Sequence, residues 1–344
     1  SMIVELDDRI RMELLELYAQ MLNAGELRVG DELERHYTTF RRKFGPDKLL
    51  ELDGEALLNA MHGPGKENMA YWLEFKDDEE FPSGFGSIAG GSSFKFGLFR
   101  KRDTGAWMTG SAQNQITLSL EQAINKAWQH REQLLAGCKL LAEFPEDGDD
   151  EDYELLQQEM DRVAPDVSDT AWGHKYFSLL YPDKLDDYHA TVYQRFHLIQ
   201  LLQVPPQMEG RYVAGGRYIA IANRLKVAVN TLSRLLNRRN GDPHEYWRMS
   251  ISVDGGEQSH WERMRAENTC SLGLIEADLS HITGDNAGRK ELYTLLQETK
   301  MKGSTQQLFD FRWNIKQGDI ILATKDATVL GVGRVTGNYF YDST

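Results

Sequence analysis

The sequence has little cysteine, no long apolar run and no signal peptide. Its two cysteines, Cys138 and Cys270, lie far apart and form no CxxC motif, which argues against a disulfide framework or a thiolate zinc site and fits a reducing cytosol. No apolar run approaches the roughly 20 residues that a membrane-spanning helix needs, and the chain starts with an acidic amphipathic pattern. We therefore expect a cytoplasmic protein without membrane contact.

Motifs for nucleotide hydrolysis and metal binding are also missing. The glycine-containing stretches 63–66 and 284–291 lack the GxxxxGK[ST] spacing that directs backbone amides and a lysine at phosphates. The nine histidines include no HExxH, and His189 and His197 have no third ligand in register, so we expect surface or core histidines. The acidic run 145–154 lacks the ligand offsets of an EF-hand. The sequence predicts no cofactor, no metal and no catalytic residue.

What is present is the composition of a globular, strongly acidic protein. The chain has 344 residues, of which 41% are hydrophobic and 27% charged, and this length suggests two or three domains. A net charge of −14 argues against nucleic-acid binding over the whole surface, because such binding needs many cations that neutralise phosphates. Any contact with nucleic acid must be local. Basic clusters at 41–43, at 100–102 and at Arg234, Arg238 and Arg239 either serve this purpose or are solvated helix ends and turns.

Apolar periodicity and turn signals divide the chain into four segments. Helical spacing dominates residues 1–144, interrupted at about 70–111 by an aromatic and glycine-rich stretch that predicts a small antiparallel sheet. The like charges of residues 145–154 favour a solvated linker between domains. A helical domain is expected over 155–244 and a β-rich domain over 245–344, so the predicted fold class is α+β. Helices in the first segment are predicted at 3–21, 30–44, 53–61 and 119–141.

Residues 221–241 have the pattern of a helix-turn-helix. A first helix is followed by a short break and by a second helix that contains TLSRLL and ends in basic residues. Such a helix suits the major groove of DNA, with Arg234, Arg238 and Arg239 on the nucleic-acid backbone. A helical hairpin packed for structure alone has the same pattern, so both interpretations stay open.

A permissive nuclease pattern gives another alternative. Asp47 follows Pro46, and Glu74 and Lys76 lie on a predicted strand, which fits the loose PD…ExK arrangement. In that arrangement two acids hold magnesium and a lysine supports phosphodiester hydrolysis. A chance match is the competing explanation in so acidic a chain. A third alternative is a protein-interaction module, which the acidic surface would suit.

Two glycines distinguish the last predicted strand. Residues 320–324 alternate as a strand does, a turn follows at Asp326, and Gly331 and Gly333 then share one face of the next strand. Glycines two positions apart leave that face without side chains. They either let a small barrel bend or let a ligand approach the backbone closely.

Two stretches carry a family resemblance: SHWERMRAENTCSLGLIEADLSHITG and, after a helix, TQQLFDFRWNIKQGDIILATKDATVLGVGRVTGNYFYD. They resemble EVE domains, which are PUA-like barrels related to YTH readers and stand at the front of McrB-type proteins of modification-dependent restriction systems. The resemblance covers about residues 246–342. The earlier DTAWGHKYFSLLYPDKLDDYH, YQRFHLIQLL and YWLEFKDDEEFPSGFGSIAGGSSFKFG resemble segments that precede this domain in such AAA proteins. The resemblance implies a C-terminal PUA-like EVE β-barrel with flanking helices, in an amino-terminal part of a longer protein.

The resemblance also implies a function. EVE and YTH modules are thought to take a modified base out of the stack and hold it against aromatic walls, which gains stacking energy and excludes the wrong base. This chain would be the DNA-recognition portion of a phage-defence restriction system, without catalysis of its own. Its partners would be modified DNA, the motor domain of the same protein and an associated nuclease subunit. The candidate base-binding residues are the aromatic Trp261, Trp313, Tyr339 and Tyr341, the polar Ser271 and Asp278, which contact the base edge or cap the next helix, and Leu274, which stands where the family often has Trp.

Overall fold

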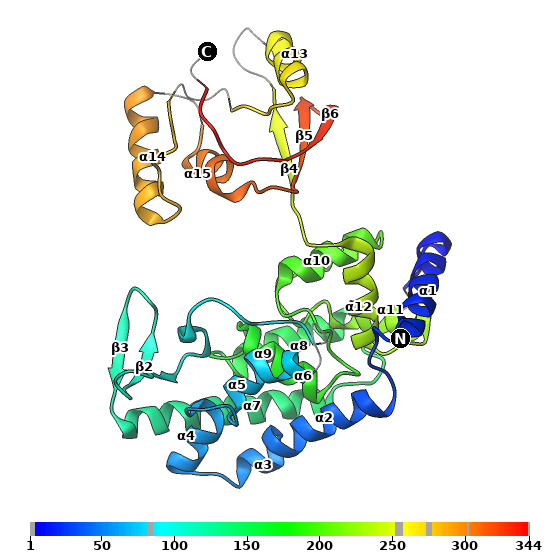
Figure 1. Cartoon of the computed structure of the whole chain (residues 1–344), viewed down its shortest axis with the longest axis vertical. Coiled ribbons are helices and arrows are strands. Elements are labelled where there is room, and N and C mark those ends of the chain that lie inside the picture. Colours follow the sequence, from blue (N-terminus) through cyan, green and yellow to red (C-terminus); the bar gives the residue numbers. More distant parts are fainter. Residues whose placement is uncertain (1–3, 81–84, 252–256, 273–276, 301–302, 343–344) are drawn as a thin grey trace. The chain divides into compact units, whose positions relative to one another are not determined.

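The chain forms two compact units, Ser1–Pro243 and His244–Thr344, here called the N-terminal and the C-terminal unit. Both combine helices with a small sheet, and helices predominate (Figure 1). The mixture of helices and small sheets expected from the sequence is confirmed. No helix in the described part of the chain is both long and apolar enough to cross a lipid bilayer. The computed structural model describes residues 4–80, 85–251, 257–272, 277–300 and 303–342.

Amphipathic helices build most of the N-terminal unit. In α1 (Asp8–Asn23) the buried residues Ile10, Leu14 and Met21 recur at helical spacing, and the Asp7 carboxylate accepts hydrogen bonds from the first turn. The four helices predicted from periodicity correspond to α1, α2, α4 and α7, with small shifts at their ends. Further helices of this unit are α2 (Asp31–Phe44), α3 (Pro46–Leu50), α4 (Gly54–His62), α7 (Leu120–Glu143), α8 (Asp150–Val163), α9 (Ala171–Leu180), α10 (Thr191–Gln200), α11 (Gly215–Leu225) and α12 (Val229–Asn240).

Two large apolar clusters lie in the N-terminal unit. The first joins helices from α2 to α9 around Phe40, Trp72 and Phe177. The second joins α1 to α10, α11 and α12. Leu185 belongs to the first cluster and Tyr188 to the second, so the short segment between α9 and α10 links the two cores.

A three-stranded antiparallel sheet covers part of α7. Its strands β1 (Phe99–Arg100), β2 (Trp107–Gly110) and β3 (Gln115–Leu118) pair in the order β1-β2-β3. Trp107 packs with Ala123 of α7 in a small separate cluster. The hairpin predicted within 70–111 is therefore confirmed, and the sheet extends beyond it to β3.

The strand predicted for Glu74 and Lys76 is wrong, because this stretch is helical. It consists of α5 (Met69–Tyr71), the π-helical η1 (Trp72–Lys76) and α6 (Asp77–Glu80), and the 3₁₀ turn η2 (Ser93–Phe96) precedes the sheet. The Asn68 side chain accepts the Tyr71 N–H and starts the helix. Met69, Trp72 and Leu73 are buried at helical spacing, so tertiary packing overrides the strand preference of the aromatic residues.

The acidic run 145–154 forms the short turn after α7 and the start of α8, and is not a linker between domains. The Asp149 carboxylate accepts the Asp152 N–H and the Asp152 carboxylate accepts the Asp149 N–H, which forms a capping box. Carboxylates at the first turn of α8 are also favoured by the helix dipole. Asp150 is paired with Arg217 of α11 at 2.9 Å. Charge repulsion is thus offset locally, and the N-terminal unit continues through this segment.

The C-terminal unit contains a mixed three-stranded sheet. Strand β4 (Tyr246–Ser250) runs parallel to β5 (Ile320–Lys325), and β5 pairs antiparallel with β6 (Thr328–Arg334) through a turn at Asp326, whose φ is 52° (Figure 1). Strands β5 and β6 and the turn between them agree with the sequence prediction. The helical elements of the unit are α13 (Glu257–Glu267), α14 (Asn286–Thr299), α15 (Thr305–Phe309) and the π-helical η3 (Asp310–Asn314).

Candidate functional site

A cavity of about 1210 Å³ lies over one face of the sheet in the C-terminal unit. Its floor combines Ile321 and Ala323 of β5 with Gly333 and Gly331 of β6, their respective cross-strand partners. Paired residues of adjacent strands point to the same face of a sheet. The side-chain-free face of β6 therefore faces the cavity.

The two floor glycines have different environments. A Cβ atom on Gly331 would lie 2.3 Å from Cη2 of Trp261, so the glycine lets this indole ring pack directly on the strand. A Cβ on Gly333 would meet nothing within 4 Å. Close approach to the backbone thus accounts for Gly331, where the approaching group is the protein's own Trp261. The floor at Gly333 is open to a ligand.

Four of the predicted base-binding residues line this cavity. Trp261 comes from α13, Ser271 from the segment after it, and Tyr339 and Tyr341 from the segment after β6. The Tyr339 hydroxyl accepts the Leu279 N–H at 3.0 Å, which orients its ring. The Tyr341 side chain is partly exposed. Three aromatic rings and a hydroxyl from distant parts of the sequence therefore surround one site.

Trp313 and Asp278 do not line the cavity. Trp313 Nε1 donates to the Ile282 carbonyl at 3.1 Å, and the indole ring lies against the Arg312 guanidinium. Trp313 therefore stabilises the loop that contains Ile282. The Asp278 carboxylate accepts the N–H and the hydroxyl of Ser280, and these bonds hold the pKa of Asp278 below its usual value. The cap of α14 is Asp285, which accepts the Gly288 N–H. Leu274 lies outside the described residues.

Sequence analysis missed several residues of the cavity. Phe311 of η3, Arg265 of α13, Arg334 of β6 and Asn338 all line it. Arg265 lies four residues after Trp261 on one helix, Arg334 follows Gly333 and Asn338 precedes Tyr339, so neighbouring positions were the available signal for these three. Phe311 reaches the site only through tertiary packing.

The predicted helix-turn-helix is present as a helical hairpin, but its second helix is buried. Helices α11 and α12 are joined through Lys226, whose φ of 55° supplies the turn that glycine usually makes. Residues 229–233, the first half of α12, are all buried. A recognition helix contacts bases with its N-terminal residues, so this burial favours a hairpin packed for structure.

The three arginines expected on a nucleic-acid backbone contact acids and carbonyls of the N-terminal unit. Arg238 is paired with the Glu26 carboxylate, and Arg234 donates to the Glu26 carbonyl at 3.1 Å. Arg239 is paired with Glu13 of α1 at 2.9 Å. These contacts attach α12 to α1 and its following turn and neutralise much of the positive charge.

The residues of the loose nuclease pattern are not arranged as a metal site. Glu74 is bound to the Lys95 ammonium group at 2.6 Å, and Lys95 also donates to the carbonyls of Ile88 and Gly90. Asp47 is in the first turn of α3. Within the described residues, no group of three or more His, Cys, Asp or Glu side chains could hold a metal ion.

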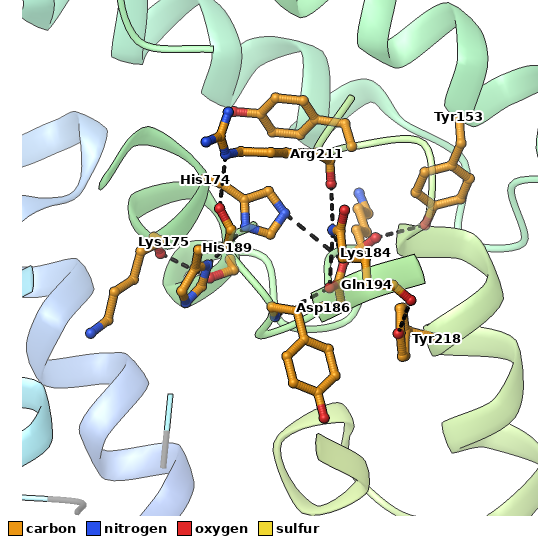
Figure 2. A network of polar contacts seen from close by, with 12 residues as sticks. Tyr153, His174, Lys175, Lys184, Asp186, His189, Gln194, Arg211 and Tyr218 are labelled. Atoms are coloured by element: carbon orange, nitrogen blue, oxygen red, sulfur yellow. Dashed lines mark hydrogen bonds and ion pairs between the residues drawn. The ribbon is translucent and has the colours of Figure 1, made fainter. Parts of the chain in front are cut away.

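A second concentration of titratable groups lies in the segment that links the two cores of the N-terminal unit (Figure 2). His189 Nε2 contacts the Phe85 carbonyl at 2.6 Å and therefore carries the proton, so in neutral His189 the other nitrogen accepts from His174 Nδ1 at 2.8 Å. His174 Nε2 lies 3.9 Å from the Asp186 carboxyl, beyond hydrogen-bond distance, and has no hydrogen-bond partner within the described residues. His174, His189 and the Phe85 carbonyl thus form one directed chain of hydrogen bonds, and Asp186 lies beside its end.

Burial favours the neutral form of the titratable groups in this network. Burial lowers the pKa of His174 to about 3. Burial also raises the pKa of Asp186 to about 7, although the hydrogen bond from Gln194 acts in the opposite direction and lowers it. Burial also raises the pKa of Asp187 to about 7, and Asp187 accepts from Asn230 and Ser233 of α12. Each of these groups is almost completely buried. The network joins helices and offers no access to a substrate.

Comparison with known proteins gives one match. Residues 247–344 match the model of a family described as a domain of unknown function, DUF8426. A search among curated proteins and a search among solved structures each found no match. The matched residues are those of the C-terminal unit, including every cavity-lining residue named above. The description of this family names no ligand, so the geometry of the cavity is the guide to function.

Proposed function

We propose that the C-terminal unit is a PUA-like EVE domain that binds a modified, flipped base of DNA in the cavity over β5 and β6. The observation that carries the proposal is the combination of a bare strand floor at Gly333 with the aromatic walls Trp261, Tyr339 and Tyr341. A nucleobase is flat, and stacking on an aromatic side chain stabilises it by about 1–3 kcal/mol. A floor without side chains leaves room for such a ring.

The size of the cavity fits more than a base alone. Small-molecule sites are typically about 300–1000 Å³, and this cavity exceeds that range. It accommodates a flipped base together with the sugar and backbone on either side. Ser271 and Asn338 supply polar groups for the base edge.

In this proposal the chain is the recognition portion of a McrB-like modification-dependent restriction protein in the cytoplasm, and its chemistry is binding. The family resemblance supplies the partners: modified DNA, a motor domain of the same protein and an associated nuclease subunit. The acidic surface restricts nucleic-acid contact to the cavity and its rim.

The test is fluorescence anisotropy with short duplexes at physiological salt. The duplexes are unmodified or carry methylated cytosine, hydroxymethylated cytosine or methylated adenine. We expect one modification to bind at least about tenfold more tightly, which corresponds to about 1.4 kcal/mol. Tyr341→Ala removes an aromatic wall residue and is expected to abolish this preference, and Trp261→Ala tests a second one.

Tyr293→Ala is the matched control. Tyr293 is 58% exposed on α14 and does not line the cavity, whereas Tyr341 is 44% exposed and does. Both substitutions remove an exposed tyrosine from the same unit. Equal affinity for all duplexes, unchanged by Tyr341→Ala, would contradict the proposal.

A further inference from the structure

Two arginines at the cavity have no polar partner. Arg265 of α13 and Arg334 at the end of β6 both line the cavity and are exposed. In the described part of the chain, neither side chain makes a hydrogen bond or an ion pair. Two arginine side chains in the lining of one cavity therefore keep their hydrogen-bonding capacity for a ligand.

Neighbouring arginines behave differently. Arg263, also at the cavity, is paired with Glu267 at 3.1 Å and with Asp342 at 3.7 Å. Arg312 donates to the carbonyls of Leu279 and Ser280. Acidic partners are abundant in a chain of net charge −14. Glu267 and Asp342, which line the same cavity, are thus paired with Arg263, whereas Arg265 and Arg334 have no ion pair within the described residues.

The chemistry of these groups selects the ligand class. A guanidinium group donates two parallel hydrogen bonds to a phosphate and stays charged at every physiological pH. A free base has no phosphate that could accept hydrogen bonds from Arg265 and Arg334. A polynucleotide strand places a phosphate on each side of a flipped nucleotide.

We infer that the cavity takes its nucleotide as part of a polynucleotide strand, with Arg265 and Arg334 binding the phosphates that flank the flipped base. The inference rests on the proposed function, since it uses the same cavity. It adds the two residues that bind the backbone of the strand, and it predicts that a free base, nucleoside or mononucleotide competes poorly. Arg265 and Arg334 are binding residues for the backbone and do not read the base.

The experiment measures anisotropy of a labelled short DNA strand with one central 5-methylcytosine, and of the same strand without the methyl group, over a range of salt concentrations. The full chain is compared with Arg265→Gln, Arg334→Gln and the double variant. Each substitution is expected to weaken binding about tenfold at low salt and to reduce the slope of log affinity against log salt by about 0.7–1. Unlabelled 5-methylcytidine and its monophosphate are expected to compete poorly.

Lys290→Gln is the control, because Lys290 is an exposed cation of the same unit outside the cavity. It is expected to leave the salt slope unchanged. Arginine variants that bind both strands with the parent affinity and slope would overturn the inference, as would competition by free 5-methylcytidine at the affinity of the strand.

The outcomes separate this inference from the proposed function. Affinity that depends on both arginines but not on any modification supports a strand site and contradicts base reading. A modification preference in a double variant whose affinity and salt slope equal those of the parent supports base reading and overturns the phosphate contacts. Binding of neither strand, modified or not, contradicts both.

Discussion

Asp186 and Asp187 of the N-terminal unit are almost completely buried, whereas Arg265 and Arg334 of the C-terminal unit are exposed at a cavity. The buried acids contact Gln194, Asn230 and Ser233. The exposed arginines have no such partner among the described residues. Both pairs are charged residue types, yet only one pair has its bonding capacity satisfied by the protein.

This difference distinguishes a buried network that stabilises the fold from a cavity that is available to a ligand. Burying a polar group costs free energy unless the protein supplies its hydrogen bonds, so a satisfied network fixes a single packing. A cavity with bare backbone, aromatic walls and unpaired cations keeps its interactions for a ligand. The perturbed pKa values of the N-terminal unit are therefore a sign of packing, although such shifts often mark catalytic sites.

The largest expected effect comes from breaking the buried network. Lys175 is fully buried, donates to the Leu73 carbonyl at 2.7 Å and lies 4.0 Å from the Asp77 carboxylate. Lys175→Met keeps much of the side-chain volume and leaves the carboxylate without this cation. We expect the free energy of unfolding to fall by about 3–5 kcal/mol in urea denaturation.

Lys139→Met is the control for this change, because Lys139 is an exposed lysine of α7. It is expected to change the free energy of unfolding by less than about 0.5 kcal/mol. Equal effects of the two substitutions would mean that the buried ammonium group does not hold the network together.

An intermediate effect is expected at the cavity floor. Gly331→Ala places a Cβ against Trp261 and is expected to destabilise the C-terminal unit by about 1–3 kcal/mol through overpacking. Gly333→Ala meets open space and is expected to be neutral or slightly stabilising. Hydrogen exchange of peptides from β5 and β6, read by mass spectrometry, distinguishes the two. Similar protection in both variants would argue against the different environments of the two glycines.

The smallest expected effect is the pH dependence of the N-terminal unit. Burial lowers the pKa of His130, His174 and His197 to about 4, 3 and 4. These histidines stabilise the fold above their unfolded pKa of about 6.5, and this contribution is lost as the pH falls through the folded values. Asp186 and Asp187 act oppositely, because their contribution is present below an unfolded pKa of about 3.9 and is lost as the pH rises through about 7.

The histidines outnumber the aspartates, so acidification from about pH 6.5 to about pH 4.5 is expected to destabilise the N-terminal unit. Asp187→Asn removes part of the opposing contribution and is expected to enlarge this loss by about 2 kcal/mol. Urea midpoints at the two pH values measure the change. Asp183→Asn, at an exposed position, is expected to match the parent protein. An unchanged loss in Asp187→Asn would contradict burial as the cause of the raised pKa.

Features that depend on the spacing of residues close together in the chain were predictable from the sequence. The helical period of α1, the turn at Asp326 and the shared face of Gly331 and Gly333 each depend on residues close together in the chain. Glu74 and Lys76 were misassigned because burial against the core, and not local preference, made that stretch helical. The prediction of a linker at the acidic run was wrong because helix capping and the ion pair with Arg217 offset the repulsion between its carboxylates.

The sequence by itself determined the helix and strand periods, the two-glycine floor and the aromatic residue types available for a site. Only the tertiary structure decided that Trp261, Tyr339 and Tyr341 share one cavity while Trp313 does not, and that Arg265 and Arg334 have no partner there. Periodicity is set by the backbone geometry of neighbouring residues. Which side chains from distant segments meet, and which keep unused hydrogen-bonding capacity, depends on packing between elements.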